Sequence, residues 1–407
     1  MLLSSTFTSL ALTLFCLSGL VSADDYLVSR ARSIGRAKRS DQTNTITILH
    51  VNDVHAHLDQ FTAAGGNCDG KKTCFGGYAR IKTKVEELRQ KYPNSLLINA
   101  GDEFQGTQFY SYYGHTVISE TINQIGFDAM TLGNHEFDGG DENLIQFIKA
   151  LTFPVICANV ESTKSGLTEL LHDYWIFPKQ ELAVVGVTTA DTPDISHPDP
   201  GTRIVHKFLE SAVLTCQRII LRDTKFLDPL KTLQITVNRI KEKHPEIKRI
   251  IAITHIGYDS DIQFAQEIEG VQLTIGGHSH TLLGNFDKSE GDYPTIVKKN
   301  RYGDEVFVVT ASKWGQYLGK IDLTYDEDGK IASYHGSPIV MESDIKPDAT
   351  IHAQVAQWRQ GFHEKSIAKI GSTQSDLNYE ECIDKECMSD QHPDEENKCT
   401  TAPTSDA

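Results

Sequence analysis

From residue 45 onward, short segments rich in β-branched and apolar residues alternate with longer amphipathic segments. The short segments predict strands over residues 45–51, 95–102, 128–134, 153–160, 182–189, 249–257 and 271–280. The longer segments carry apolar residues at helical spacing and predict helices over residues 78–92, 115–126, 142–152, 230–244 and 351–367. Residues 305–312, 317–326 and 330–341 predict a final antiparallel set of strands. Alternating strands and helices of this length predict an α/β domain.

The two ends of the chain lack this alternation. Residues 9–21 form a short apolar run that ends in small residues, which predicts a signal peptide over residues 1–23, followed by a flexible leader over 24–44. The basic stretch that ends at Lys38 and Arg39 is either a second processing site or a solvated charge cluster. We therefore predict a folded domain over residues 45–372. The acidic, turn-rich residues 373–407 predict a disordered tail, because they are too poor in apolar residues to bury a core.

Composition narrows the class of protein. The chain has 407 residues, of which 39% are hydrophobic and 23% are charged, and this balance is typical of a globular protein. Its formal net charge of −16 argues against nucleic acid or an anionic membrane surface as the main partner. An anionic small substrate stays possible, since a bound metal ion can dominate the field of its site. No lipid-anchor pattern is evident at the C-terminus, which predicts a protein without a membrane anchor.

Two pairs of cysteines lie close together in turn-rich segments. Cys68 and Cys74 flank one such loop, and Cys382 and Cys387 flank another. In an oxidising compartment, this spacing predicts two local disulfides. Cys157 lies in an apolar segment and is predicted to be a buried thiol.

Polar side chains of the kind that bind metals follow five of the predicted strands. They are Asp53 and His55, then Asp102, then Asn134 and His135, then His255, and last His278 with His280. Each alone has a structural explanation, because histidines are often hydrogen-bonded core residues and aspartates often cap helices or form turns. Together they indicate a ligand site, because open α/β sheets bind ligands at the carboxyl ends of their strands. Oxygen and imidazole ligands without cysteine suit Zn²⁺ or Mn²⁺, and two such ions together can activate a water and hold a phosphoryl oxygen.

The segments DVHAH, GDEFQGT, GNHEFD, THIG and GGHSH, in this order, closely resemble the motifs of calcineurin-like metallophosphoesterases, and among these the secreted 5′-nucleotidases. The resemblance implies a four-layer αββα sandwich with two divalent metal ions, Zn²⁺ or Mn²⁺. It implies the following roles: Asp53, His55 and His280 for the first ion, Asp102 as the bridge, Asn134, His255 and His278 for the second ion, and His135 with Asp138 as a catalytic pair. Asp138 is also a candidate N-cap of the helix that follows it.

The same resemblance implies a secreted enzyme that hydrolyses nucleoside 5′-monophosphates such as AMP. Alternatives within the family are an apyrase or a UDP-sugar hydrolase. Residues 206–229 are atypical for the family and are either a helical insertion or an artefact of gene prediction. The family's C-terminal nucleotide-binding domain has no counterpart here, and Ile383 stands where relatives place an arginine, so that residues 373–407 are also a candidate remnant of an interdomain linker. These departures predict weak nucleotide binding, or an impaired form that holds metal without efficient turnover.

Overall fold

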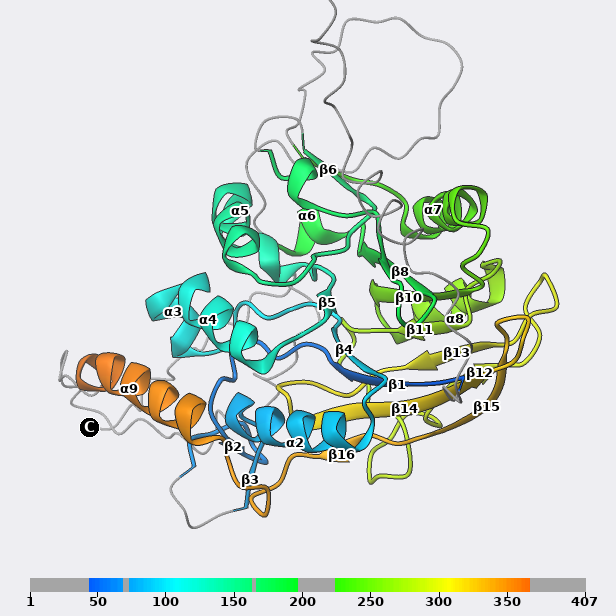
Figure 1. Ribbon diagram of the computed structural model, residues 1–407. Helices are drawn as coiled ribbons and strands as arrows, with labels where there is room; N and C mark the ends of the chain where they lie inside the picture. The colour runs from blue at the N-terminus through cyan, green and yellow to red at the C-terminus, as the bar shows by residue number, and fades with distance from the viewer. Residues whose placement is uncertain (1–43, 69–72, 163–165, 197–223, 367–407) are drawn as a thin grey trace, which may run out of the picture. The chain divides into compact units, whose positions relative to one another are not determined.

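The computed structural model describes residues 44–68, 73–162, 166–196 and 224–366 (Figure 1). Two six-stranded sheets form its centre. The first has the order β15-β14-β1-β4-β5 with β16 paired to β14, and its strands are β1 (Thr45–Val51), β4 (Ser95–Asn99), β5 (Ala129–Met130), β14 (Tyr317–Tyr325), β15 (Ile331–Gly336) and β16 (Ile339–Val340). The second has the order β12-β13-β11-β10-β8-β7, and its strands are β7 (Tyr174–Phe177), β8 (Leu182–Thr188), β10 (Arg249–His255), β11 (Leu273–Ile275), β12 (Thr295–Val297) and β13 (Val306–Val309).

Both sheets combine parallel and antiparallel strands: the first has antiparallel strands on one side of its parallel strands, and the second has an antiparallel strand at each edge. In the first sheet, β1, β4 and β5 run parallel, whereas β14 is antiparallel to β1. In the second sheet, β8, β10, β11 and β13 run parallel. Consequently the carboxyl ends of the central strands of each sheet lie at one edge, where the loops that follow them gather.

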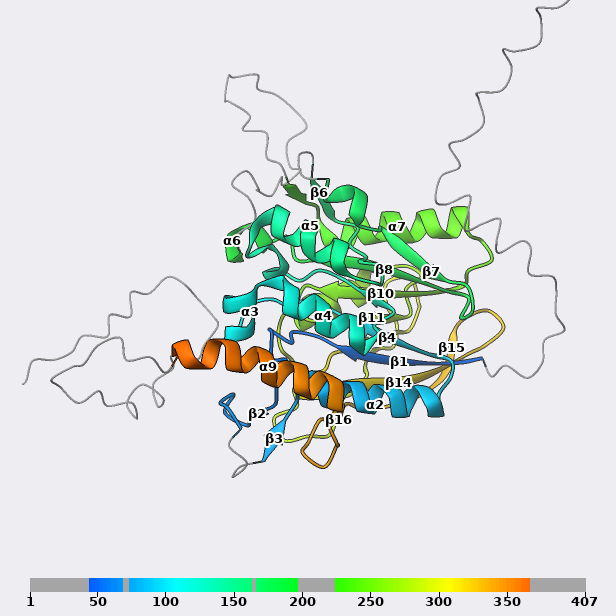
Figure 2. The same cartoon turned by 60° about the vertical axis from the view of Figure 1, so that its left-hand side comes forward.

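Helices flank the two sheets. They are α2 (Tyr78–Lys91), α3 (Gln108–Tyr113), α4 (His115–Ile125), α5 (Gly140–Ala150), α6 (Thr192–Ile195), α7 (Pro229–Lys243), α8 (Tyr258–Glu267) and α9 (Ala349–Ser366). Figures 1 and 2 show α2 on the outer side of the first sheet and α7 on the outer side of the second. The shorter elements are the 3₁₀ helices η1 (His135–Phe137) and η2 (Thr168–Leu170), and the pairs β2 (Phe61–Thr62) with β3 (Cys74–Phe75) and β6 (Val160–Ser162) with β9 (Thr224–Phe226).

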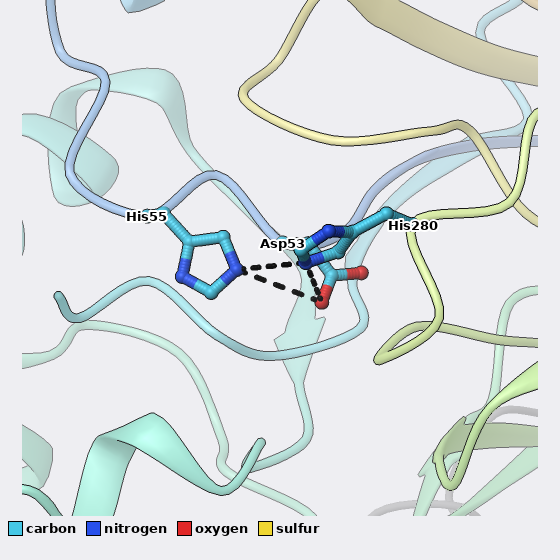
Figure 3. A group of neighbouring side chains, drawn as sticks. All are labelled: Asp53, His55 and His280. Carbon is cyan, nitrogen blue, oxygen red and sulfur yellow. Dashed lines mark hydrogen bonds and ion pairs between the residues drawn. The ribbon is translucent and has the colours of Figure 1, made fainter. Parts of the chain in front are cut away.

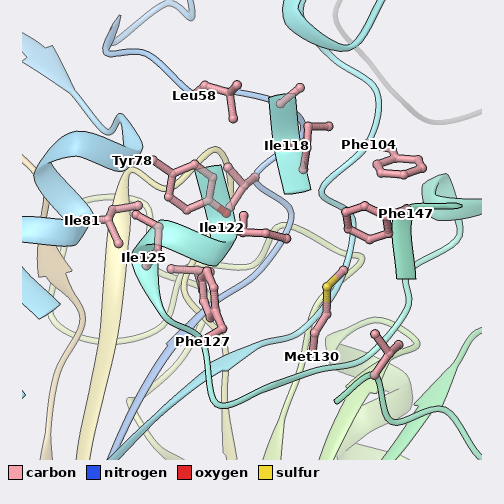
Figure 4. Close-up of a cluster of buried hydrophobic side chains, with 14 of the residues drawn as sticks. Leu58, Tyr78, Ile81, Phe104, Ile118, Ile122, Ile125, Phe127, Met130 and Phe147 are labelled. Carbon is pink, nitrogen blue, oxygen red and sulfur yellow. The ribbon is translucent and has the colours of Figure 1, made fainter. Parts of the chain in front are cut away.

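Three apolar layers hold this arrangement together. Between the sheets, Ile48 and Ile98 pack in one buried cluster with Val184 and Ile251. A second cluster lies between the first sheet and its helices; Figure 4 shows part of it, including Tyr78, Ile81, Ile122 and Ile125. A third joins α7 to the second sheet. The layer order helix, sheet, sheet, helix confirms the predicted αββα sandwich.

Most of the predicted elements are present, with two differences. The prediction of an antiparallel set that includes residues 305–312 is wrong for β13: this strand joins the second sheet parallel to β11, whereas β14 and β15 complete the first sheet. The predicted strand over 153–160 is reduced to isolated bridges at Val155 and Ile156 and to the start of β6. Apolar runs of similar composition enter either sheet, so composition alone does not assign them.

The structure also bears on the predicted cysteines and segment boundaries. Cys68 and Cys74 form a disulfide and Cys157 is a buried free thiol, as predicted. The predicted signal peptide, the leader, the pair Cys382 and Cys387, and the tail lie outside the described residues. Of the atypical segment 206–229, residues 224–226 form β9, and Phe226 packs against Phe137. Among the described residues, no helix has the length and apolarity needed to cross a membrane.

Candidate metal centre

The nine predicted site residues follow β1, β4, β5, β10 and β11 at their carboxyl ends; His255 is the last residue of β10, and His135 is the first residue of η1. Several of these loops bend sharply at the predicted ligands. Residues with positive φ among them are Asp53, His55, Asp102, His278 and His280. This left-handed conformation is uncommon outside glycine and is typically retained where the surrounding structure and a functional site require it.

Asp53, His55 and His280 form the first ligand cluster (Figure 3). The Nε2 atoms of the two histidines are 3.0 Å apart, and they lie 3.9 Å (His55) and 3.5 Å (His280) from Oδ1 of Asp53. The Asp53 carboxylate is itself held by the side-chain amide of Asn52 and by the backbone N–H of His278, at 2.7 and 3.0 Å. Three potential ligand atoms therefore converge within 4.8 Å of one another.

Asp102, His255 and His278 form the second ligand cluster. His255 Nε2 lies 3.0 Å from Asp102 Oδ2 and 3.7 Å from Asp53 Oδ1, so the two clusters are adjacent. Asn134 Oδ1 is buried without a hydrogen-bond partner, and His255 Nε2 is buried with the Asp102 carboxylate as its close neighbour. A buried amide oxygen without a partner is costly unless another group satisfies it, and two buried carboxylates close together need positive charge beside them. A divalent cation would do so, and the donor set present in this chain therefore fits a metal pair.

Backbone carbonyl groups fix the orientation of two of these imidazole rings. His55 Nδ1 lies 3.2 Å from the carbonyl oxygen of Phe104, and His255 Nδ1 lies 2.7 Å from that of Ala100. A hydrogen bond at Nδ1 leaves Nε2 as the nitrogen that faces the clusters, which is the arrangement typical of metal-binding histidines.

Burial and the neighbouring carboxylates set the charge of the ligands. Burial lowers the pKa of His278 to about 4 and that of His280 to about 3, so both are neutral and able to coordinate. Burial also lowers the pKa of His255, but the charges of Asp102 and Asp53 outweigh it and raise this pKa to about 10. The pKa of Asp102 would be raised by burial, yet the nearby histidines hold it well below its usual value. Two carboxylates thus make this spot strongly attractive to positive charge.

His135 and Asp138 form a separate hydrogen-bonded pair beside the clusters. His135 Nδ1 and Asp138 Oδ2 are 2.7 Å apart, and a ring nitrogen of His135 lies within 4.8 Å of ligand atoms of His55 and Asp102. Burial lowers the pKa of His135, but the hydrogen bond to Asp138 and the surrounding carboxylates raise it to about 9. The N-cap of α5 is Gly139, which leaves the Asp138 side chain to the imidazole.

Two residues at this site were not singled out from the sequence. The Ser196 hydroxyl donates to Asp138 Oδ1 at 2.5 Å, so that both carboxylate oxygens of Asp138 are engaged. The carboxylate of Glu136 accepts four backbone N–H groups from the loops that carry Asp102 and Asn134. Glu136 lies inside the motif GNHEFD, but nothing in the residue type or spacing specifies backbone partners.

Residues 46–282 match the family of calcineurin-like phosphoesterases. Over 355 residues the chain is 36% identical to human 5′-nucleotidase, an alignment that covers 84% of this chain and 58% of the human protein. The crystal structure of a 5′-nucleotidase precursor from Thermus thermophilus is similar, with a TM-score of 0.69, 32% identity, and coverage of 80% of this chain and 61% of the bacterial one. The structure of an NAD nucleotidase from Haemophilus influenzae has a TM-score of 0.67 at 27% identity, and the similarity covers 79% of this chain and 60% of that one.

The chain thus spans less than two thirds of the length of these relatives. The matched segment contains all the residues of both ligand clusters and the His135–Asp138 pair. From its fold, its paired His and Asp clusters and these similarities, the chain belongs to the calcineurin-like phosphoesterase family and, within it, to the 5′-nucleotidases.

Proposed function

We propose that this chain is a secreted phosphoesterase that uses two divalent metal ions to hydrolyse nucleoside 5′-monophosphates, such as AMP, to the nucleoside and phosphate. The observation that supports this proposal best is the adjacency of two His–Asp clusters with a His–Asp pair beside them. Asp102 lies near histidines of both clusters, so the two clusters can hold a pair of metal ions side by side. The neighbouring His135, with its raised pKa, can carry a positive charge that suits a phosphoryl group.

In this proposal the ligands divide as the resemblance implied. Asp53, His55 and His280 hold one ion, Asn134, His255 and His278 hold the other, and Asp102 lies between them. Bound there, the ions supply Lewis-acid activation of water and neutralise charge on the phosphoryl group. The mixture of carboxylate, amide and imidazole ligands suits Zn²⁺ or Mn²⁺.

The His135–Asp138 pair supplies what the ions do not. The carboxylate of Asp138 accepts a hydrogen bond from Nδ1 of His135 and favours the imidazolium form, which matches the raised pKa of this histidine. A cationic imidazole can stabilise negative charge on a phosphoryl oxygen or on the leaving oxygen. Asp138 fixes the ring orientation, so that the second nitrogen is free to face the substrate.

Two observations support secretion as part of the proposal. The disulfide between Cys68 and Cys74 is of the kind that persists in oxidising compartments. The apolar run over residues 9–21, with small residues after it, has the pattern of a signal peptide.

A phosphate-release assay on the purified full chain tests the function. The chain, loaded with Mn²⁺ or Zn²⁺, is given AMP, ADP, a UDP-sugar and p-nitrophenyl phosphate. We expect release from AMP. Release from ADP in place of AMP would indicate an apyrase, and release from the UDP-sugar in place of AMP would indicate a UDP-sugar hydrolase. Release from p-nitrophenyl phosphate alone would support the metal centre without nucleotide selectivity. No release from any ester by protein that contains two metal ions would contradict the proposal.

A further inference from the structure

The side chain of Glu136 is completely buried, and each of its carboxylate oxygens accepts two backbone N–H groups. Oε2 accepts from Gly133 at 2.6 Å and from Asp102 at 3.0 Å. Oε1 accepts from Glu103 at 2.6 Å and from Phe104 at 3.3 Å. A carboxylate offers about four acceptor positions, so Glu136 has none left for an ion or a substrate.

The four donors belong to the two loops that supply the centre of the site. Three of them lie in the loop after β4, which carries Asp102, and the fourth lies in the loop after β5, which carries Asn134 and His135. The same two loops are joined a second time, because the backbone N–H of His135 donates to Asp102 Oδ1 at 2.9 Å. They also approach so closely that a Cβ at Gly133 would meet the Asp102 side chain.

The loop after β4 needs such an anchor. Asp102 has a φ of +60°, a conformation in which a non-glycine residue is held by its surroundings and not by its own preference. The backbone N–H groups of residues 102–104 have no strand partner at this turn, and buried N–H groups are nearly always satisfied in native proteins. The Glu136 carboxylate satisfies all three and thereby fixes where the Asp102 side chain points.

We propose that Glu136 is a positioning residue of the metal centre: its carboxylate holds the β4 and β5 loops in register, so that Asp102 lies between the two ligand clusters. The inference rests on the proposed two-metal function. Glu136 acts through Asp102 and does not contact the reacting atoms. Its nearest equivalent in other metal sites is the outer-shell group that orients a ligand.

The substitution Glu136→Gln isolates this role because it preserves size. An amide keeps one acceptor oxygen and presents an NH₂ group to the other two N–H donors. In either orientation of the amide, two of the four hydrogen bonds are lost and donors face each other. Loss of an outer-shell partner typically weakens metal affinity or activity about 10–100-fold, and we expect a weakening of that size in Mn²⁺ binding.

The decisive measurement is electron paramagnetic resonance of the full chain loaded with Mn²⁺. Two Mn²⁺ ions held close together by the two clusters would give an exchange-coupled spectrum, whereas ions bound far apart would give the spectrum of isolated Mn²⁺. We expect Glu136→Gln to lose much of the coupled spectrum, together with the weaker Mn²⁺ binding. Glu142→Gln is the matched control: Glu142 is exposed on α5 and bonds only to the side chain of Gln146 in the described part of the chain, so both readouts should remain unchanged.

Retention of the full coupled spectrum and of Mn²⁺ affinity in a folded Glu136→Gln variant would overturn the inference. If that variant does not fold, as judged by circular dichroism, Glu136→Asp replaces it. The shorter carboxylate keeps its charge but cannot span both loops, so a folded Glu136→Asp chain with an unchanged spectrum also contradicts the proposal. Failure of both variants to fold would make Glu136 a residue of general stability and end its specific role. Because the spectrum needs no turnover, a wild-type chain that couples two Mn²⁺ ions yet hydrolyses nothing would fail only the proposed function.

Discussion

The ligand clusters and the His135–Asp138 pair lie next to each other in the structure, yet two of the cluster histidines differ from His135 in charge. His278 and His280 are in the clusters and have lowered pKa values of about 4 and 3, because burial disfavours the imidazolium. His135 is adjacent in sequence to Asn134 and has a raised pKa of about 9, because Asp138 offsets the cost of partial burial. A carboxylate close to the ring, and not the exposure of the ring, sets this charge, because the fully buried His255 beside Asp102 also has a raised pKa, of about 10.

The ligand clusters and the His135–Asp138 pair also differ in burial and in hydrogen bonding. Asp53 and His255 of the clusters are fully buried, whereas the side chains of His135 and Asp138 retain 24% and 17% exposure; among the cluster residues, His280 is comparable at 21%. Beside the clusters, Asn134 Oδ1 is a buried polar atom without a partner that a cation would satisfy, whereas His135 and Asp138 are hydrogen-bonded to each other. Perturbing the clusters should therefore remove metal and catalysis together, while perturbing the pair should remove catalysis alone.

Metal removal should have the largest effect. Treatment of the full chain with a strong chelator should abolish phosphate release and lower the melting temperature, because the buried carboxylates Asp53 and Asp102 lose the cations that balance their charge. At free metal about 100–1,000 times its Kd, bound metal contributes about 3–4 kcal/mol to the free energy of unfolding. Activity assays and thermal melts before and after addition of Zn²⁺ or Mn²⁺ check this. Full activity in a chain shown by elemental analysis to be metal-free would contradict the proposal that the two clusters act by binding metal ions.

Asp102→Ala should have the second-largest effect, because it removes the carboxylate that lies between the two clusters. The variant loses the carboxylate that lies 3.0 Å from His255 Nε2 and is expected to bind fewer than two ions per chain. Turnover should fall by about 10³-fold or more, because activation of water and neutralisation of phosphoryl charge both depend on the two metal ions. Metal content by elemental analysis and rates on p-nitrophenyl phosphate provide the readouts. If the variant kept two tightly bound ions, the bridging role of Asp102 would be wrong.

His135→Ala tests the other side of the comparison. The variant should retain both ions, because the His135 imidazole hydrogen-bonds to Asp138, while the bond from His135 to Asp102 is made by the backbone N–H, which alanine keeps. Its kcat should fall by about 10²–10⁴-fold, the range typical for removal of a positioned acid or base. Metal content and kcat measured on the same preparation decide the matter. Loss of an ion along with activity would place His135 among the metal ligands, and the His135–Asp138 pair would then not be functionally separate from the clusters.

The sequence allowed prediction of the clusters better than of their surroundings. Asp53, Asp102 and His255 follow parallel strands, so their convergence is a consequence of strand direction and can be expected before the structure is known. By contrast, Glu136 binds backbone N–H groups, which every residue except proline carries, and no residue pattern marks them. The assignment of β13 to the second sheet also escaped prediction, since apolar alternation is the same for a strand of either sheet.

Ser196→Ala should have the smallest effect, and it tests how far the hydrogen bond from Ser196 supports Asp138 in the His135–Asp138 pair. Ser196 donates to Asp138 Oδ1 at 2.5 Å, and its loss leaves Asp138 held by His135 alone. Because solvent can reach this partly exposed pair and replace the hydroxyl, we expect only about a 3–10-fold fall in kcat. Metal content should not change. Ser333→Ala, on the exposed face of β15, is the matched control and should behave as wild type.

A double-mutant cycle shows whether Ser196 acts through the pair. If the Ser196 hydroxyl serves only to orient Asp138, and Asp138 serves only to orient and charge His135, then Ser196→Ala should cost nothing further in a chain that already carries His135→Ala. Residues that act through one another give such non-additive effects, whereas independent residues give additive ones. Equal falls in kcat in both backgrounds would show that Ser196 contributes by another route. A vanishing effect would place Ser196, Asp138 and His135 in one hydrogen-bonded line that is functionally distinct from the metal ligands beside it.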